Sequence, residues 1–316
     1  RAHQADQRPV IDKSRFFLQA MRWFRAGENV IANARPLLGE GFSAQDAIEI
    51  AYDLQSGSYI EALSQPDHAR ENAAWGQRVA GVLQELGVRS ACEAGVGEAT
   101  TLAAIARAAG SGITFAGFDI SLSRLLFGRD YLHRQGVAAR LFCADLLRIP
   151  LPDSAVDAVI TNHGIEPNGG QEEPILGELL RVCARYLVLI EPDFERAGEA
   201  QRARMLQHNY VRDLPRHLQA LPATVIRNEP WPFHPNPENK AALIVVEKRE
   251  KCVAPPAFDF VSPVTRSPLR PLQGYLFCDE EGLLYPEPFG IPVLRDDCAL
   301  VCSHASRFGS TEKGSK

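Results

Sequence analysis

The sequence lacks any apolar stretch long enough to cross a bilayer, and it lacks an excess of positive charge. Its 316 residues include 34 Lys and Arg against 39 Asp and Glu, which gives a net charge of −5. A crossing helix needs about 20 successive apolar residues, and binding to a polyanion relies on a basic surface. We therefore expect no membrane span, and a nucleic-acid partner is disfavoured.

Cysteine is odd in number, with seven residues in the chain. Cys92, Cys143 and Cys183 fall within apolar runs, where they are expected to be small buried hydrophobic residues. The start of the chain shows no signal-peptide pattern. These features favour a reducing compartment, and we expect a cytoplasmic protein.

The middle of the chain alternates apolar strand-like runs with helical spacing, which predicts a parallel α/β sheet covered on both faces. A helical N-terminal cap is expected over 1–87, with one of its helices spanning 43–63. The sheet domain is expected over 88–250, and a Pro-rich linker follows near 254–256. A small β-rich domain is expected over 259–305, and the polar residues 306–316 are expected to be a disordered tail.

One segment joins a strand end, two glycines and a helix start. An apolar run ends at Glu93, Gly95 and Gly97 follow, and helical spacing resumes at Leu102. The glycines allow a sharp turn and a close approach to a ligand. The helix directs free N–H groups and the positive end of its dipole at the same place. This order predicts a nucleotide-type site.

Polar residues follow the next strands. Asp119 lies about twenty residues beyond the glycines, where a ribose with two free hydroxyls is held in related folds. Asp145 ends the third apolar run, and Asn162 and His163 end the fourth. Asp119 and Asp145 could alternatively be plain strand-end acids, and Glu93 could instead brace its loop.

This series resembles the class I S-adenosylmethionine-dependent methyltransferases over residues 88–250. The resemblance implies a Rossmann-like seven-stranded sheet and S-adenosylmethionine as the cofactor. It places Asp119 on the ribose hydroxyls, Asp145 beside the adenine, and Glu93 at the methionine end. Ala99 stands where the family often has a third glycine. The cofactor-binding residues that the resemblance implies are Tyr59, Glu93, Gly95, Gly97, Asp119, Ile120, Asp145, Leu146 and Asn162.

The acceptor side offers two histidines. His163 is the leading general base because imidazole titrates near neutral pH; otherwise it packs beside the cofactor or caps a helix. His208, with Tyr210, lies on a predicted helical insert over 192–221 and is either a second base or a solvated surface residue. Glu166 and Glu191 could bind substrate hydroxyls, orient a histidine or act as helix-cap acids.

The C-terminal segment resembles the small Trm112-like zinc-ribbon family, in which two Cys-x-x-Cys pairs can hold zinc. The corresponding positions here read Ser262, Thr265, Cys278 and Glu281. Structural zinc prefers thiolate and imidazole ligands, and a single thiolate remains. We therefore expect no metal at this place.

The function expected from these features is methyl transfer to an oxygen of a small polar acceptor, such as a sugar or glycoconjugate. One alternative is methylation of a protein or tRNA that is docked by the C-terminal domain. Another is a non-catalytic scaffold or regulatory subunit that binds the cofactor. The sequence is also compatible with a homo-oligomer.

Overall fold

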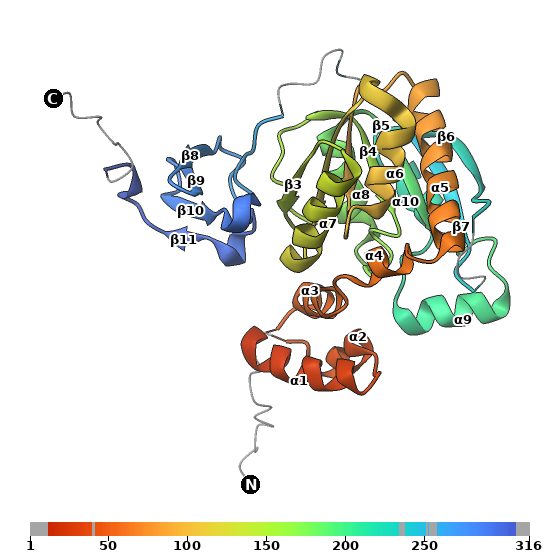
Figure 1. Ribbon diagram of the computed structural model, residues 1–316, viewed down its shortest axis with the longest axis horizontal. Coiled ribbons are helices and arrows are strands. Elements are labelled where there is room, and N and C mark those ends of the chain that lie inside the picture. Colours follow the sequence, from red (N-terminus) through yellow and green to blue (C-terminus); the bar gives the residue numbers. More distant parts are fainter. Residues whose placement is uncertain (1–11, 40–41, 234–237, 251, 253–257, 308–316) are drawn as a thin grey trace, which may run out of the picture. The chain divides into compact units, whose positions relative to one another are not determined.

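The computed structural model describes residues 12–39, 42–233, 238–250, 252 and 258–307 (Figure 1). Two compact units make up the chain, residues 1–56 and 57–316. The linker expected near 254–256 and residues 308–316 of the expected tail lie outside the described part.

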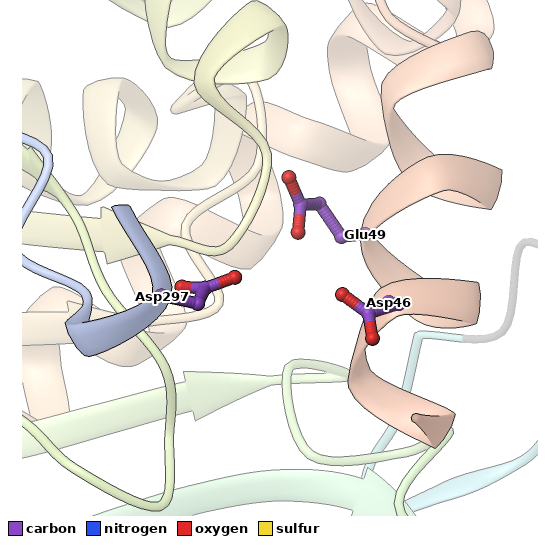
Figure 2. A group of neighbouring side chains, drawn as sticks. All are labelled: Asp46, Glu49 and Asp297. Atoms are coloured by element: carbon purple, nitrogen blue, oxygen red, sulfur yellow. The ribbon is translucent and has the colours of Figure 1, made fainter. Parts of the chain in front are cut away.

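The first unit is a small helical cluster. Its helices begin at side-chain caps, since Asp12, Asn29 and Ser43 each accept a backbone N–H of the first turn. Lys13 forms ion pairs with Asp46 at 3.4 Å and Glu49 at 2.5 Å, and Figure 2 shows both carboxylates on the same helix. The elements are α1 Lys13–Arg25, α2 Val30–Ala34, the 3-10 turn η1 Arg35–Leu37 and α3 Ala44–Leu54.

The single helix predicted over 43–63 was wrong. The structure has α3 ending at Leu54 and a separate α4, Ser58–Ala62. Between them Gly57 takes a left-handed conformation with φ +97°, which interrupts the run of helical hydrogen bonds. A further helix, α5, follows over Pro66–Glu85.

The second unit is built on a seven-stranded sheet with the order β3-β2-β1-β4-β5-β7-β6. β1 to β5 are parallel, and β7 pairs antiparallel with β5 and β6. The predicted Rossmann-like fold is confirmed. The strands are β1 Ser90–Ala94, β2 Thr114–Asp119, β3 Ala139–Cys143, β4 Val156–Asn162, β5 Cys183–Pro192, β6 Ala223–Pro230 and β7 Ala241–Lys248.

Helices cover both faces of this sheet (Figure 1). One apolar core joins α5, α6 and α7 to the sheet, and the other joins α8 and α10 to it. Because both faces are covered, β4 and β5 are buried along nearly their whole length. The remaining elements are α6 Thr100–Ala109, η2 Gly110–Gly112, α7 Leu122–Gln135, α8 Glu172–Val182, α9 Glu199–His208 and α10 Leu214–Gln219.

A small antiparallel sheet follows, with the order β11-β10-β9-β8. Phe260, Tyr285 and Leu294 of this segment belong to the same apolar core as α8. The small sheet therefore packs on the large one. Its elements are β8 Arg270–Leu272, β9 Tyr275–Cys278, β10 Leu283–Pro286, η3 Pro288–Gly290, η4 Asp296–Cys298, β11 Leu300–Val301 and η5 Ala305–Arg307.

Among the described residues, no helix combines the length and the apolar character that a bilayer crossing requires.

Candidate active site

The glycine loop connects β1 to α6 at the carboxyl edge of the sheet. Gly95 and Gly97 are both left-handed, with φ +71° and +53°, and so is Ala99, with φ +54°. A Cβ on Gly95 would lie 2.6 Å from the Cα of Gly164, in the loop after β4. Any side chain at residue 95 would therefore push the two loops apart. The close approach that the structure shows at Gly95 is to the loop that carries His163, and the predicted approach to a ligand stays a prediction.

Asp119, at the end of β2, is connected directly to this loop. Its carboxylate accepts the N–H of Gly97 and the N–H of Ser121, each at 2.9 Å, and 8% of the residue is exposed. Burial raises the pKa of Asp119, although the Arg124 charge and the backbone N–H groups oppose this rise. Ile120 follows and is half-buried. The predicted ribose acid thus lies beside the glycines.

Asp145 and Leu146 follow β3 and are both half-buried. The Asp145 carboxylate accepts the N–H of Leu147 at 2.9 Å. Burial raises the pKa of Asp145; the Leu147 N–H and the Arg295 charge lower it, while the charges of Asp296 and Asp297 raise it. Sequence reasoning gave no sign of this arginine.

Glu93 is the next-to-last residue of β1 and is buried, with 1% of its surface exposed. One carboxylate oxygen accepts the Thr101 hydroxyl at 2.7 Å. The other oxygen, and Oδ1 of Asn162 at the end of β4, are buried without a donor among the described residues. Burial, with the neighbouring Asp119 charge, raises the pKa of Glu93 to about 8, although the Thr101 hydrogen bond opposes the rise. The neighbouring strands β1 and β4 thus each end near a buried oxygen that can accept a hydrogen bond from a ligand.

A residue inside the glycine loop holds the start of α4. The Glu98 side chain, 2% exposed, accepts the N–H groups of Gly57 at 2.9 Å, Tyr59 at 3.4 Å and Ile60 at 2.8 Å. The guanidinium of Arg124 lies 4.9 Å from the centre of the Tyr59 ring. Tyr59 is therefore tied to the loop on two sides, although 51% of it remains exposed. Neither Glu98 nor Arg124 was predicted from the sequence.

His163 takes a left-handed conformation, with φ +52°. Its Nδ1 lies 2.5 Å from Oε2 of Glu166. That carboxylate also accepts the side-chain amide of Asn239 at 3.0 Å and the hydroxyl of Tyr210. The insert after β5 and the segment before β7 thus contribute to one cluster with the loop after β4. Asn239 is a further residue that the sequence did not indicate.

The histidine and its partner shift each other's protonation. Burial lowers the pKa of His163, but the hydrogen bond and charge of Glu166, with the Glu191 charge, outweigh it and leave that pKa raised. Burial raises the pKa of Glu166, and His163, Asn239 and Tyr210 outweigh it in the other direction. With Nδ1 facing Glu166, the free Nε2 is the ring atom left to accept a proton.

Glu191 and His208, which were also predicted on the acceptor side, lie near the His163–Glu166 pair. Glu191 accepts the N–H groups of Gly164 at 3.0 Å and Ile165 at 3.3 Å, so it braces the loop after β4. Burial raises its pKa to about 7, although the nearby His163 lowers it. His208 is the last residue of α9, and its ring centre lies 5.5 Å from that of Tyr210. It neighbours the cluster through Tyr210.

The four positions expected to replace a zinc site converge in the small sheet. Ser262, fully buried, donates to Glu281 at 2.6 Å and also contacts the Tyr285 hydroxyl at 3.1 Å. The N–H of Thr265 donates to the same Glu281 carboxylate at 2.9 Å. Cys278 shares a side-chain hydrogen bond with Glu281. A hydrogen-bonded cluster connects the two turns at this place.

A glycine loop, acids at the ends of β1, β2 and β3, and a 3-2-1-4-5-7-6 sheet together define the class I methyltransferase architecture. Residues 91–186 match the family model described as a methyltransferase domain. Residues 91–186 thus have the sequence pattern of a methyltransferase domain. No curated protein sequence matches the chain at a significant level.

Several solved structures are similar to part of this chain. Magnesium protoporphyrin IX methyltransferase from Synechocystis PCC 6803 with bound SAH is 15% identical over 56% of this chain and 84% of that one, with a TM-score of 0.46. A methyltransferase from Aquifex aeolicus is 16% identical over 53% and 87%, with a TM-score of 0.40. Mitomycin 7-O-methyltransferase is 16% identical over 76% of this chain and 69% of that one, with a TM-score of 0.48.

The residues of this site fit S-adenosylmethionine. The cofactor carries an α-ammonium group, which has three donors, and a positively charged sulfur. The buried Glu93 and Asn162 oxygens lack donors, and a cation would offset the cost of burying the Glu93 carboxylate. At the end of β2, the Asp119 carboxylate can accept hydrogen bonds from ribose hydroxyls. After β3, the Asp145 carboxylate can accept one from the amino group of an adenine.

Proposed function

We propose that this chain transfers the methyl group of S-adenosylmethionine to a hydroxyl oxygen of a small polar acceptor, such as a sugar or glycoconjugate. The observation that carries the proposal is the His163–Glu166 pair, held in a loop whose Gly164 abuts the glycine loop at Gly95. This position brings a proton acceptor beside the cofactor-binding loop.

The bound cofactor would supply an electrophilic methyl group on its sulfonium sulfur. His163 takes the hydroxyl proton of the acceptor on Nε2, which leaves the acceptor oxygen able to accept the methyl group. Glu166 keeps Nδ1 protonated and stabilises the imidazolium that forms. Tyr210 and Asn239 hold the Glu166 carboxylate in place.

Two further features support a compact acceptor with hydroxyl groups. The Trp75 ring centre lies 6.2 Å from that of His163 and 6.1 Å from that of Phe233. Phe233 is half-buried, and sugar rings pack their C–H faces on aromatic side chains. The net charge of −5 favours a neutral acceptor over a polyanion.

We further propose that residues 259–305 form a unit similar to the Trm112-like zinc ribbons, with the metal replaced by hydrogen bonds. The convergence of Ser262, Thr265, Cys278 and Glu281 supports this proposal.

The test uses donor carrying a tritiated methyl group, the full chain, and a cell extract separated into small-molecule, protein and RNA fractions. The proposal expects label in the small-molecule fraction as a base-stable ether, and far less label with His163→Asn. Label in protein or RNA instead would support the docked-macromolecule alternative. Donor binding without labelling of any fraction would support a non-catalytic scaffold.

A further inference from the structure

The C-terminal segment continues the large sheet beyond β3. The N–H of Cys143 donates to the carbonyl of Pro292, and the N–H of Leu294 donates to the carbonyl of Cys143, both at 2.8 Å. Val293 thereby pairs in parallel with Cys143, the last residue of β3. This pairing fixes residue 295 next to the loop that carries Asp145.

Arg295 follows directly and is 6% exposed. Its Nε and Nη2 donate to the two carboxylate oxygens of Asp297, at 2.9 and 2.6 Å, and Figure 2 labels Asp297 on the short helix η4. Its Nη1 lies 3.4 Å from the carbonyl oxygen of Ile120, the residue after Asp119. The same guanidinium is close enough to Asp145 to lower its pKa.

One buried cation therefore connects the loop after β2 to the loop after β3. Burying a guanidinium is costly unless every side of it is engaged. Asp297 does not require a buried partner, because 42% of its side chain is exposed and a surface arginine could pair with it. The burial of Arg295 therefore indicates a further role. The Asp297 carboxylate binds Nε and Nη2 and so fixes the orientation of the guanidinium. The third nitrogen, Nη1, is directed at the carbonyl of Ile120, beside the predicted ribose acid Asp119.

We propose that Arg295 is a positioning residue for the nucleoside end of the methyl donor, so that the C-terminal unit completes the cofactor site. This inference rests on the proposed placement of the donor at Asp119 and Asp145. Arg295 holds the Ile120 carbonyl in place and offsets the repulsion that Asp296 and Asp297 exert on Asp145. It acts through those groups and makes no bond in the reaction.

The experiment measures the Kd of the full chain for two ligands by calorimetry. S-adenosylhomocysteine has both ends of the donor, and 5′-methylthioadenosine has the nucleoside without the amino-acid end. Arg295→Met keeps the length of the side chain and removes its donors and charge, and we expect Kd to rise roughly tenfold for both ligands. Arg295→Lys restores the charge and should recover part of the affinity for both.

Two matched variants separate this role from general damage. Arg148 pairs with Asp296 across the same contact but is 56% exposed, so Arg148→Met should leave both Kd values within about twofold. Glu93→Gln should weaken S-adenosylhomocysteine far more than 5′-methylthioadenosine, since Glu93 serves the amino-acid end.

The unfolding temperatures of all variants are measured alongside. Wild-type Kd values in Arg295→Met overturn the inference, and so does a loss that Arg295→Lys does not relieve at an equal unfolding temperature. If Arg295→Met does not fold, the Arg295→Lys affinities decide: a loss of affinity for both ligands at an unchanged unfolding temperature supports the inference, and wild-type affinities or a loss confined to S-adenosylhomocysteine overturn it. If the wild type binds neither ligand, the proposed donor site itself is wrong.

Discussion

Oε2 of Glu166 lies 2.5 Å from Nδ1 of His163, three residues earlier in the same loop. The pair has the arrangement of a general base with its orienting carboxylate, in which the carboxylate fixes the tautomer and leaves the other ring nitrogen to take a proton.

Replacing His163 by Asn should lower kcat by roughly 10²- to 10⁴-fold, the usual contribution of a general base. Asn is the matched choice because residue 163 has φ +52°, a conformation that Asn tolerates better than Ala. The Kd for S-adenosylhomocysteine should stay within about twofold, since the imidazole is proposed to act on the acceptor. His208→Ala should retain most activity, and a wild-type kcat in the double variant would exclude both histidines as bases.

The rate should rise with pH through the His163 pKa, because only the neutral imidazole accepts a proton. That pKa is raised, so the rise should have its midpoint above 6.5, the ordinary histidine value. Glu166→Gln removes the charge that favours the imidazolium; the pKa then falls, and the midpoint should move down by about one pH unit or more.

The plateau rate of Glu166→Gln should also fall, because the ring loses its orienting carboxylate. A profile of kcat from pH 5.5 to 9.5 measures both effects. The exposed Glu173 of α8 is the matched control, since its change to Gln removes an equal charge elsewhere. An unmoved midpoint in Glu166→Gln would show that this histidine does not govern the rise.

Donor binding should release a proton near pH 7. Burial raises the pKa of Glu93 to about 8, so this carboxyl is mostly protonated when the site is empty. A bound cation favours the carboxylate and lowers that pKa below the working pH, which should free up to about one proton per chain. Calorimetry in two buffers of different ionisation enthalpy counts it. The count should vanish in Glu93→Gln and persist in Glu173→Gln; equal heats in both buffers with the wild type would contradict the assignment.

Glu98→Ala should destabilise the second unit and loosen Tyr59. The change leaves the N–H groups of Gly57, Tyr59 and Ile60 without their shared acceptor. We expect the free energy of unfolding to fall by about 1–3 kcal/mol, with a smaller loss in Glu98→Gln, which keeps one acceptor oxygen. Urea unfolding measures both variants, and equal stability of Glu98→Ala and wild type would show that water replaces the carboxylate at no cost.

The sheet and the glycine loop could be predicted because their signals are local. Strand runs, a glycine pair and an acid at a fixed distance all lie within one stretch of sequence, and the structure has Gly97 bonded to Asp119 as that spacing indicates. His163 and Glu166 were both candidates as well. What the sequence left open was their pairing, which depends on the left-handed turn at residue 163.

The remaining parts depend on contacts between distant segments. Glu98 reaches Gly57 across 41 residues, and Arg295 reaches Ile120 across 175. No periodicity or spacing encodes such a pairing, because each residue alone has the pattern of an ordinary surface charge. The break at Gly57 had a local signal, a glycine in a helical stretch, but the same signal is compatible with a continuous helix.

Introducing thiols at three positions of the small sheet should create a zinc site. Ser262→Cys, Thr265→Cys and Glu281→Cys, with the native Cys278, would place four thiolates where hydrogen bonds already join the side chains. Zinc takes four thiolates in tetrahedral geometry, so one equivalent should bind and raise the unfolding temperature. The matched control keeps Glu281 and changes the other two residues, which leaves three thiolates and should bind zinc more weakly. A folded triple variant that takes up no zinc would show that these turns are set for hydrogen bonds and lie too far apart for a metal.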